Sequence, residues 1–207
     1  MKWHHKILFL TFSFIVIGLI AGVWKEKNKA ASETPTLIAG TFLRESQNFP
    51  SFNLLDMYHQ PFSELNFIGN WNIVFFGYTQ CPDICPHTLH LLANLKKRPD
   101  LQWLNLIFIS INPERDSPEQ LKKFLEQPTF SHAKIHGLTG NKSLIHALAS
   151  EIGLFIEQQT NEQQPIGHSG TVLVINPKGE IQALLTHIQD ELILAHDLKR
   201  IMRFKKT

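Results

Sequence analysis

The stretch that decides the fold is Ile73-Val-Phe-Phe-Gly-Tyr78, followed closely by Cys81-Pro-Asp-Ile-Cys85-Pro86. An uninterrupted apolar run of this kind is typical of a strand that is buried on both faces. Proline suits the first turn of a helix, because the N–H that it lacks would have no partner within the helix there. The sequence therefore predicts a strand, a short loop and a helix in which Cys85 is the N-cap and Pro86 the first residue.

The two cysteines of this stretch are the only ones in the chain, so both thiols belong to one site. A helix N-terminus stabilises negative charge, and the thiolate is the form of cysteine that binds metals and attacks disulfides. We therefore expect a reactive dithiol in which the pKa of at least Cys85 is lowered. The alternative is a pair of buried apolar cysteines without chemistry, which their exclusive pairing at a strand–helix junction disfavours.

Composition and charge exclude one class of partner. The chain has 207 residues, of which 43% are hydrophobic and 18% are charged, as expected for one globular domain with a short extension. The net charge of +2 is too small to indicate nucleic-acid binding. Part of the basic excess also lies in the terminal segments 25–29 and 203–207. We therefore expect no nucleic acid among the partners.

The N-terminal segment Ile7 to Trp24 carries no charged residue. At a rise of ~1.5 Å per residue it extends about 27 Å as a helix, close to the ~30 Å hydrocarbon core of a bilayer. A cleaved secretory signal is the alternative, but its apolar region is usually ~7–15 residues long and small residues follow it closely. Here Ala30-Ala-Ser32 comes only after three lysines. We therefore expect a membrane anchor at residues 1–24.

The remaining chain divides into a polar linker at 25–45 and one folded domain at 46–207. The domain alternates strand and helix patterns. Strands are predicted at 52–55, 73–76, 104–111, 134–138, 171–175 and 181–185, and helices after Cys85, at 117–126, at 144–152 and from Asp190 onward. A turn at 176–179 joins the last two strands into a hairpin, which we place at the sheet edge. This order predicts an α/β fold with a central mixed β-sheet flanked by helices.

Several motifs in this order resemble the Sco/SenC family of copper-binding assembly proteins. They are Phe75-Phe-Gly-Tyr-Thr-Gln-Cys-Pro-Asp-Ile-Cys-Pro86, Ile109-Ser-Ile-Asn-Pro-Glu-Arg-Asp-Ser-Pro118, Gly137-Leu-Thr-Gly140, and His168-Ser169 before a strand that ends in Asn-Pro-Lys-Gly. The resemblance covers roughly Phe49 to Arg203. Two cysteines separated by three residues would be a weak signal alone, whereas the combination is specific.

The resemblance implies a thioredoxin-like fold preceded by one N-terminal transmembrane helix, and a role in delivering copper to cytochrome oxidase. It also implies that Cys81, Cys85 and His168 are the copper ligands. The expected location is the bacterial inner membrane, with a single pass and the globular domain facing the periplasm. Charge counting alone mildly favours the opposite orientation, because lysines after the anchor outnumber those before it.

Two positions depart from the family pattern. The family commonly has Asp immediately before the ligand histidine and Asp at the start of the D-P-x-R-D segment, whereas this chain has Gly167 and Asn112. Neither change removes a ligand. We expect Gly167 to leave the His168 loop less constrained, and a less acidic surrounding to alter partner docking or the redox balance of the metal.

The predicted ligand set suits a copper carrier. Thiolate favours Cu(I), and an imidazole extends the site to Cu(II). Three ligands also leave room for exchange, unlike the closed four-ligand set of structural zinc. Among the 11 histidines, His168 stands out by position and motif. His87 could supply the third nitrogen in principle, but a place on the helix surface explains both His87 and His90 equally well.

We therefore predict a copper metallochaperone, not a catalyst, that docks onto the copper-bearing subunit of cytochrome oxidase or its precursor. Another copper carrier or a thiol reductant is a further expected partner. The alternative is a membrane-tethered thiol–disulfide oxidoreductase, with Cys81 attacking and Cys85 as its partner. Peroxide reduction is a third reading, which the context of Thr79 supports only faintly.

Overall fold

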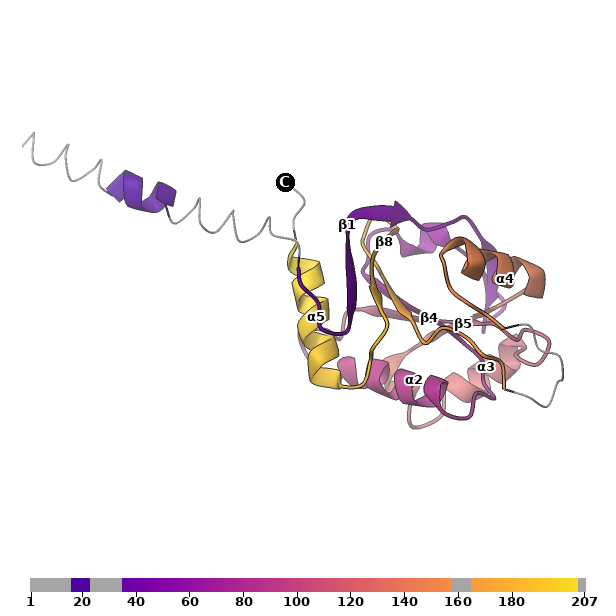
Figure 1. Cartoon of the computed structure of the whole chain (residues 1–207). Coiled ribbons are helices and arrows are strands. Elements are labelled where there is room, and N and C mark those ends of the chain that lie inside the picture. Colours follow the sequence, from indigo (N-terminus) through magenta and orange to yellow (C-terminus); the bar gives the residue numbers. More distant parts are fainter. Residues whose placement is uncertain (1–15, 23–34, 158–164, 205–207) are drawn as a thin grey trace, which may run out of the picture. The chain divides into compact units, whose positions relative to one another are not determined.

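The structure is a computed structural model that describes residues 16–22, 35–157 and 165–204 (Figure 1). Its main folded unit runs from Thr36 to Met202. The strands are β1 (Gly40–Asn48), β2 (Asn53–Asp56), β3 (Pro61–Ser63), β4 (Asn72–Gly77), β5 (Asn105–Ser110), β6 (His136–Thr139), β7 (Val172–Ile175) and β8 (Glu180–Leu185). The helices are α2 (Ile84–Leu95), α3 (Pro118–Leu125), α4 (Lys142–Glu151) and α5 (Glu191–Arg203), with short 3-10 turns at Glu64–Phe67 and Ser131–Ala133.

The predicted membrane anchor lies mostly outside the described residues. Residues 16–22 of it are described and are helical. Within the described ranges, no helix is both long and apolar enough to cross a bilayer.

The eight strands form one mixed sheet in the order β1-β8-β7-β4-β5-β6-β2-β3. The central strands β4, β5 and β6 are parallel to one another, whereas β7 runs antiparallel to β4. This confirms the predicted α/β fold with a central mixed sheet. The β7–β8 hairpin was expected at the sheet edge, and that expectation is wrong because β1 pairs along β8 and forms the edge instead.

Strand β1 begins at Gly40, inside the range 25–45 that the sequence predicts as a linker. An edge strand has one neighbour and exposes much of its surface, so its sequence is too polar to read as a buried strand. Strand β1 is held in place by a residue that is far away in the sequence. The buried carboxylate of Asp197 in α5 accepts the backbone N–H groups of Ile38 and Ala39 at 2.9 and 2.7 Å. The ordered fold therefore starts before the predicted boundary at residue 46.

Helices cover both faces of the sheet. Figure 1 shows α2 and α3 on one side of β4 and β5, and α4 on the other. Parallel strands need crossover connections, and right-handed crossovers place the helices of consecutive β-α-β units on the same face. Ser117 caps α3 by accepting the N–H of Gln120. Gly153 ends the turn after α4 with a positive φ of 75°, which glycine adopts at little cost.

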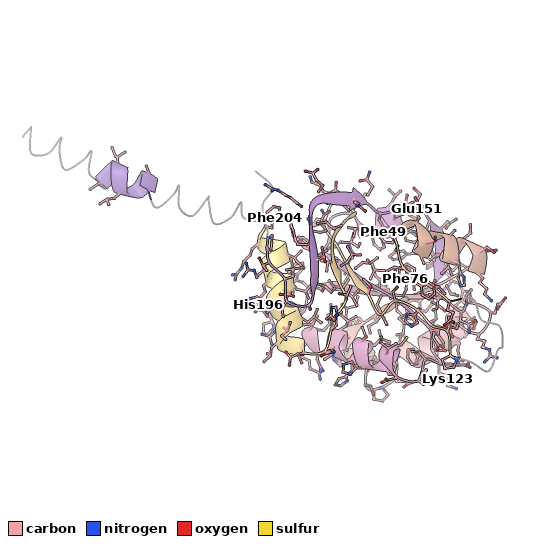
Figure 2. The ribbon with its side chains drawn as sticks, viewed as in Figure 1. Phe49, Phe76, Lys123, Glu151, His196 and Phe204 are labelled. Atoms are coloured by element: carbon pink, nitrogen blue, oxygen red, sulfur yellow. The ribbon has the colours of Figure 1, made fainter. Side chains whose placement is uncertain are left out.

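Aromatic side chains of the central strands form the core. Phe75, Phe76 and Phe108 are at most 1% exposed, and Figure 2 shows Phe76 inside the domain while Lys123 and Glu151 lie at its surface. The sequence pattern also places Trp103 in the core, which is wrong. Trp103 lies in the loop before β5, is 49% exposed and donates its indole N–H to the Asp100 carbonyl.

Candidate metal centre

The sheet brings the three predicted ligands together at the C-terminal end of β4. Cys81 and Cys85 follow β4, and His168 precedes β7. Because β7 is antiparallel to β4, with Val172 opposite Phe75, the start of β7 lies beside the end of β4. The Sγ atoms of both cysteines and a ring nitrogen of His168 lie within 4.8 Å of one another. Among the described residues this is the only such group, and it contains neither His87 nor His90.

The start of α2 differs from the sequence prediction. Asp83, not Cys85, is the N-cap, so Cys85 and Pro86 lie inside the first turn. Asp83 makes no side-chain capping bond. Instead, the Cys81 sulfur accepts the backbone N–H of Cys85, with 3.4 Å between N and Sγ. The thiol of Cys81 therefore takes the position of a capping side chain, which no local capping rule anticipates.

The electrostatics of the two thiols are opposite. Hydrogen bonds from the Cys85 thiol and from the backbone N–H groups of Cys85 and Asp83, together with the nearby His168 ring, hold the pKa of Cys81 well below its usual value. The pKa of Cys85 is raised, because its thiol donates to Cys81 and because it is buried. The expected lowering therefore falls on Cys81 and not on Cys85. Cys81 is 8% exposed and Cys85 is completely buried.

Gly77, the last residue of β4, makes room for the Cys85 thiol. A Cβ atom at this position would lie 2.8 Å from the Cys85 sulfur and 2.8 Å from Cε2 of Phe108. The Phe108 ring belongs to the packed core and cannot move aside cheaply. A glycine is therefore required here for close approach of the sulfur to the strand, a role that the sequence pattern does not disclose.

His168 presents one ring nitrogen to the thiols. Its Nε2 lies 3.4 Å from the Cys85 sulfur, and its Nδ1 lies 3.0 Å from the carbonyl oxygen of Ser169. Since a carbonyl only accepts, the Nδ1 proton points to Ser169 and the lone pair of the neutral ring is on Nε2. A backbone acceptor of this kind is the usual second partner of a metal-binding imidazole. The ring is therefore oriented for Nε2 ligation.

The backbone on both sides of His168 is tied down. His168 pairs with Ile156 in an isolated β-bridge, and the Ser169 N–H donates to the Phe155 carbonyl at 2.9 Å. The hydroxyl oxygen of Tyr78 accepts the N–H of Ile166 at 3.0 Å. These bonds restrain the backbone on both sides of Gly167, and the effect of the missing aspartate side chain stays a prediction.

Gly167 also lies under a carboxylate. A Cβ atom at Gly167 would collide with the side chain of Glu157, whose Oε2 lies closest. The Glu157 N–H donates to the Gly167 carbonyl at 2.7 Å. An acidic group therefore stands directly over the residue before His168, although residue 167 has no side chain of its own.

Asp116 supports the cysteine loop from inside. The structure buries the Asp116 side chain, which accepts hydrogen bonds from the Thr79 N–H, the Thr79 hydroxyl and the Ser110 hydroxyl at 3.0, 2.5 and 2.6 Å. Arg115 reaches the Gln80 side chain at the surface. Asp116 thus joins β5 to the loop that carries Cys81.

Fold and site together define a thioredoxin-like domain with two cysteines and one histidine grouped at the start of its first long helix. The family model SCO1/SenC matches residues 43–203. The chain therefore belongs to the SCO1/SenC family.

Curated relatives and solved structures agree with this assignment. A Stutzerimonas stutzeri protein, whose name describes it as a candidate copper-binding protein, is 35% identical over 77% of this chain and 78% of its own length. The mouse mitochondrial SCO2 homolog is 33% identical, and the match covers 62% of this chain but only 52% of the mouse protein.

Among solved structures, copper-bound ScoI of Arabidopsis thaliana has a TM-score of 0.66 and 27% identity, covering 74% of this chain and 97% of its own. Copper-bound yeast Sco1 has a TM-score of 0.65 and 27% identity, covering 77% and 90%. The fold is thus one that carries copper in its solved relatives, and the Cys-Cys-His group of this chain is one that could bind copper.

Proposed function

We propose that this chain is a membrane-tethered copper metallochaperone that serves the assembly of a cytochrome oxidase copper centre. The observation that carries the proposal is that the ligand atoms of Cys81, Cys85 and His168 lie within 4.8 Å of one another. Two thiolates bind Cu(I) strongly, and the imidazole allows the same site to hold Cu(II).

The proposed site is suited to exchange. Cys85 is fully buried, whereas Cys81 keeps 8% exposure and His168 is half-buried. An incoming ligand could therefore approach copper from the side of Cys81 and His168. Two large apolar side chains next to the site are exposed, Ile84 by 42% and Phe155 by 64%. Exposed apolar surface of this kind favours docking of another protein, which supports transfer of copper to a recipient.

The recipient in this proposal is the copper-bearing subunit of cytochrome oxidase or its precursor. Residues 7–24 anchor the chain in the bacterial inner membrane and the folded domain faces the periplasm, where that subunit would be met. Another copper carrier or a thiol reductant supplies copper or electrons. This part rests on the family's role and on the uncharged N-terminal segment.

The first test of the proposal is copper stoichiometry. The full chain, reduced and kept in detergent, should bind one Cu(I) per monomer in an anaerobic titration against a chromophoric Cu(I) chelator. Excess Zn(II) should not displace the copper, because a site with only three ligands and two soft sulfurs favours Cu(I) over zinc. A chain that leaves all copper on the chelator would overturn the proposal.

Membrane orientation is the second test. We expect a periplasm-only reporter fused after Thr207 to be active in a bacterial host and a cytoplasm-only reporter to be silent. The free N-terminal amine and two lysines precede the anchor, so the opposing charge bias is smaller than a count of lysines suggests. The reverse pattern of reporter activity would contradict both the orientation and the delivery role.

A second candidate function is thiol–disulfide exchange with the cysteines of the copper-site precursor. The specific observation in its favour is the asymmetry of the pair. Cys81 is slightly exposed and has the lowered pKa, whereas Cys85 is buried with a raised pKa. An accessible thiolate beside a buried thiol is the arrangement of an attacking and a resolving cysteine.

Alkylation of the copper-free, reduced chain measures this asymmetry. Iodoacetamide should modify Cys81 before Cys85. Cys81 is a thiolate at any pH above its lowered pKa and is protonated only when the pH falls through that value. The rate at which iodoacetamide alkylates Cys81 should therefore change less than twofold between pH 8 and pH 6. An ordinary thiol slows by roughly two orders of magnitude over that range. Peptide mass spectrometry separates the two sites, and faster modification of Cys85 would exclude Cys81 as the attacking thiol.

A further inference from the structure

A second group of metal-binding side chains lies next to the Cys81–Cys85–His168 centre. Asp83 and His87 belong to the start of α2, and His187 belongs to the loop between β8 and α5. All three line one cavity of about 330 Å³. The cavity therefore collects a carboxylate and two imidazoles from two separate parts of the fold.

These side chains are available for a ligand. Asp83 is an N-cap residue without a side-chain capping bond, because the Cys81 sulfur takes the N–H of Cys85. The His87 ring has no hydrogen-bond partner within the described part of the chain. His187 uses Nδ1 toward the Thr186 hydroxyl at 2.9 Å, which leaves its Nε2 open. An N-cap aspartate normally bonds its own helix, so an uncapped one that lines a cavity together with two histidines is unusual.

The cavity shares a wall with the first site. Ile84 and Gly170 line it, and Ile84 directly precedes Cys85. The Ile84 side chain packs on Gly170, where an added Cβ atom would lie 2.5 Å from Cδ1 of Ile84. Gly170 is two residues after His168. A metal in the cavity would thus lie near the dithiol, with Ile84 in the cavity wall on the side of Cys85.

We propose that Asp83, His87 and His187 form a second copper site that takes Cu(II). Imidazole nitrogen and carboxylate oxygen suit Cu(II), which binds such donors more strongly than the other divalent ions of the first transition series. In the structure, these three side chains are not among the groups that lie close enough together to hold an ion. All three side chains are exposed, and exposed side chains change rotamer within nanoseconds, so they can close on an ion.

Because their donor atoms differ, the two sites favour different oxidation states of copper. The cavity offers imidazole nitrogen and carboxylate oxygen donors, whereas the neighbouring centre offers two sulfurs and one nitrogen. If the chain carries copper as proposed above, the cavity is the place where Cu(II) is first captured beside the thiols. The site itself does not depend on that function, because its ligands are separate residues.

The test removes the first site and measures Cu(II) alone. The full chain with C81S, C85S and H168A is titrated with Cu(II) in detergent and followed by electron paramagnetic resonance. We expect a signal with nitrogen hyperfine coupling that lacks any thiolate-to-copper absorption. Adding H87A or H187A should lower the apparent affinity at least tenfold. If the triple substitution prevents folding, H168A protein with both thiols alkylated serves for the same titration.

The matched control is H90A, because His90 is exposed on the same helix but does not line the cavity. It should leave Cu(II) affinity unchanged. Equal affinity with and without His87 and His187 would overturn the proposal, as would equal losses in H87A and H90A. Cu(I) binding to the unaltered chain tests the Cys81–Cys85–His168 centre separately. Failure of that centre and failure of the second site can therefore be told apart.

Discussion

Replacing Cys81 or Cys85 by serine should weaken Cu(I) binding about a thousandfold or more, which corresponds to about 4 kcal/mol of binding free energy. A serine hydroxyl is a hard donor that binds Cu(I) poorly, so each variant retains only one thiolate and one imidazole. Both substitutions should leave the domain folded, because the two cysteines are free thiols and no disulfide links them.

The two variants should differ in stability. Cys85 is completely buried against Gly77 and Phe108, so a serine hydroxyl there loses its water contacts and costs about 1–3 kcal/mol. Cys81 is partly exposed, and its sulfur accepts a backbone N–H that a serine oxygen can also accept. We therefore expect Cys81→Ser to unfold close to the temperature of the unaltered chain and Cys85→Ser to unfold earlier.

Chelator competition and thermal unfolding followed by circular dichroism measure the two effects. His90→Ala is the control for copper binding, since His90 lies on the same helix outside the metal group. A cysteine variant that still binds Cu(I) like the unaltered chain would remove that cysteine from the ligand set. A variant that fails to fold would instead indicate that the pair is structural.

The central part of the fold is predictable from local sequence. The apolar run at 73–78, the cysteines and Pro86 define a strand, a loop and a helix, because burial on both faces and first-turn proline leave strong local patterns. The edge strand β1 leaves no such pattern. It is polar and half exposed, and its place depends on pairing with β8 and on a carboxylate in α5.

The grouping of the three candidate ligands is also predictable, but the residues that hold them in place are not. Cys81 and Cys85 are conspicuous as the only cysteines, and His168 is identified by its motif. Gly77 and Asp116 act through contacts between strands and loops that are far apart in sequence. The reversal of the two thiol pKa values has the same origin. It follows mainly from the hydrogen bond that the buried Cys85 thiol donates to the Cys81 sulfur, a geometry that residue spacing does not fix.

Replacing His168 by alanine should separate the two oxidation states of copper. Nε2 of His168 is the ring nitrogen that faces the thiols, and its orientation is fixed by the bond from Nδ1 to the Ser169 carbonyl. Without it, the thiolates of Cys81 and Cys85 can still hold Cu(I), whereas Cu(II) depends on imidazole. We expect Cu(II) affinity at the dithiol to fall about a hundredfold or more, and Cu(I) affinity to fall about tenfold or less.

The measurement must report on the dithiol itself. Thiolate-to-copper charge-transfer absorption does so for Cu(II), because a copper ion bound elsewhere on the chain by nitrogen and oxygen lacks this band. Chelator competition reports Cu(I). Tyr78→Phe provides a graded comparison. It removes the hydroxyl that accepts the Ile166 N–H but leaves every ligand in place, so it should weaken the Cu(II) band less than His168→Ala does. Equal retention of both oxidation states in His168→Ala would exclude His168 as a ligand, and the third donor would then have to come from another side chain such as His87.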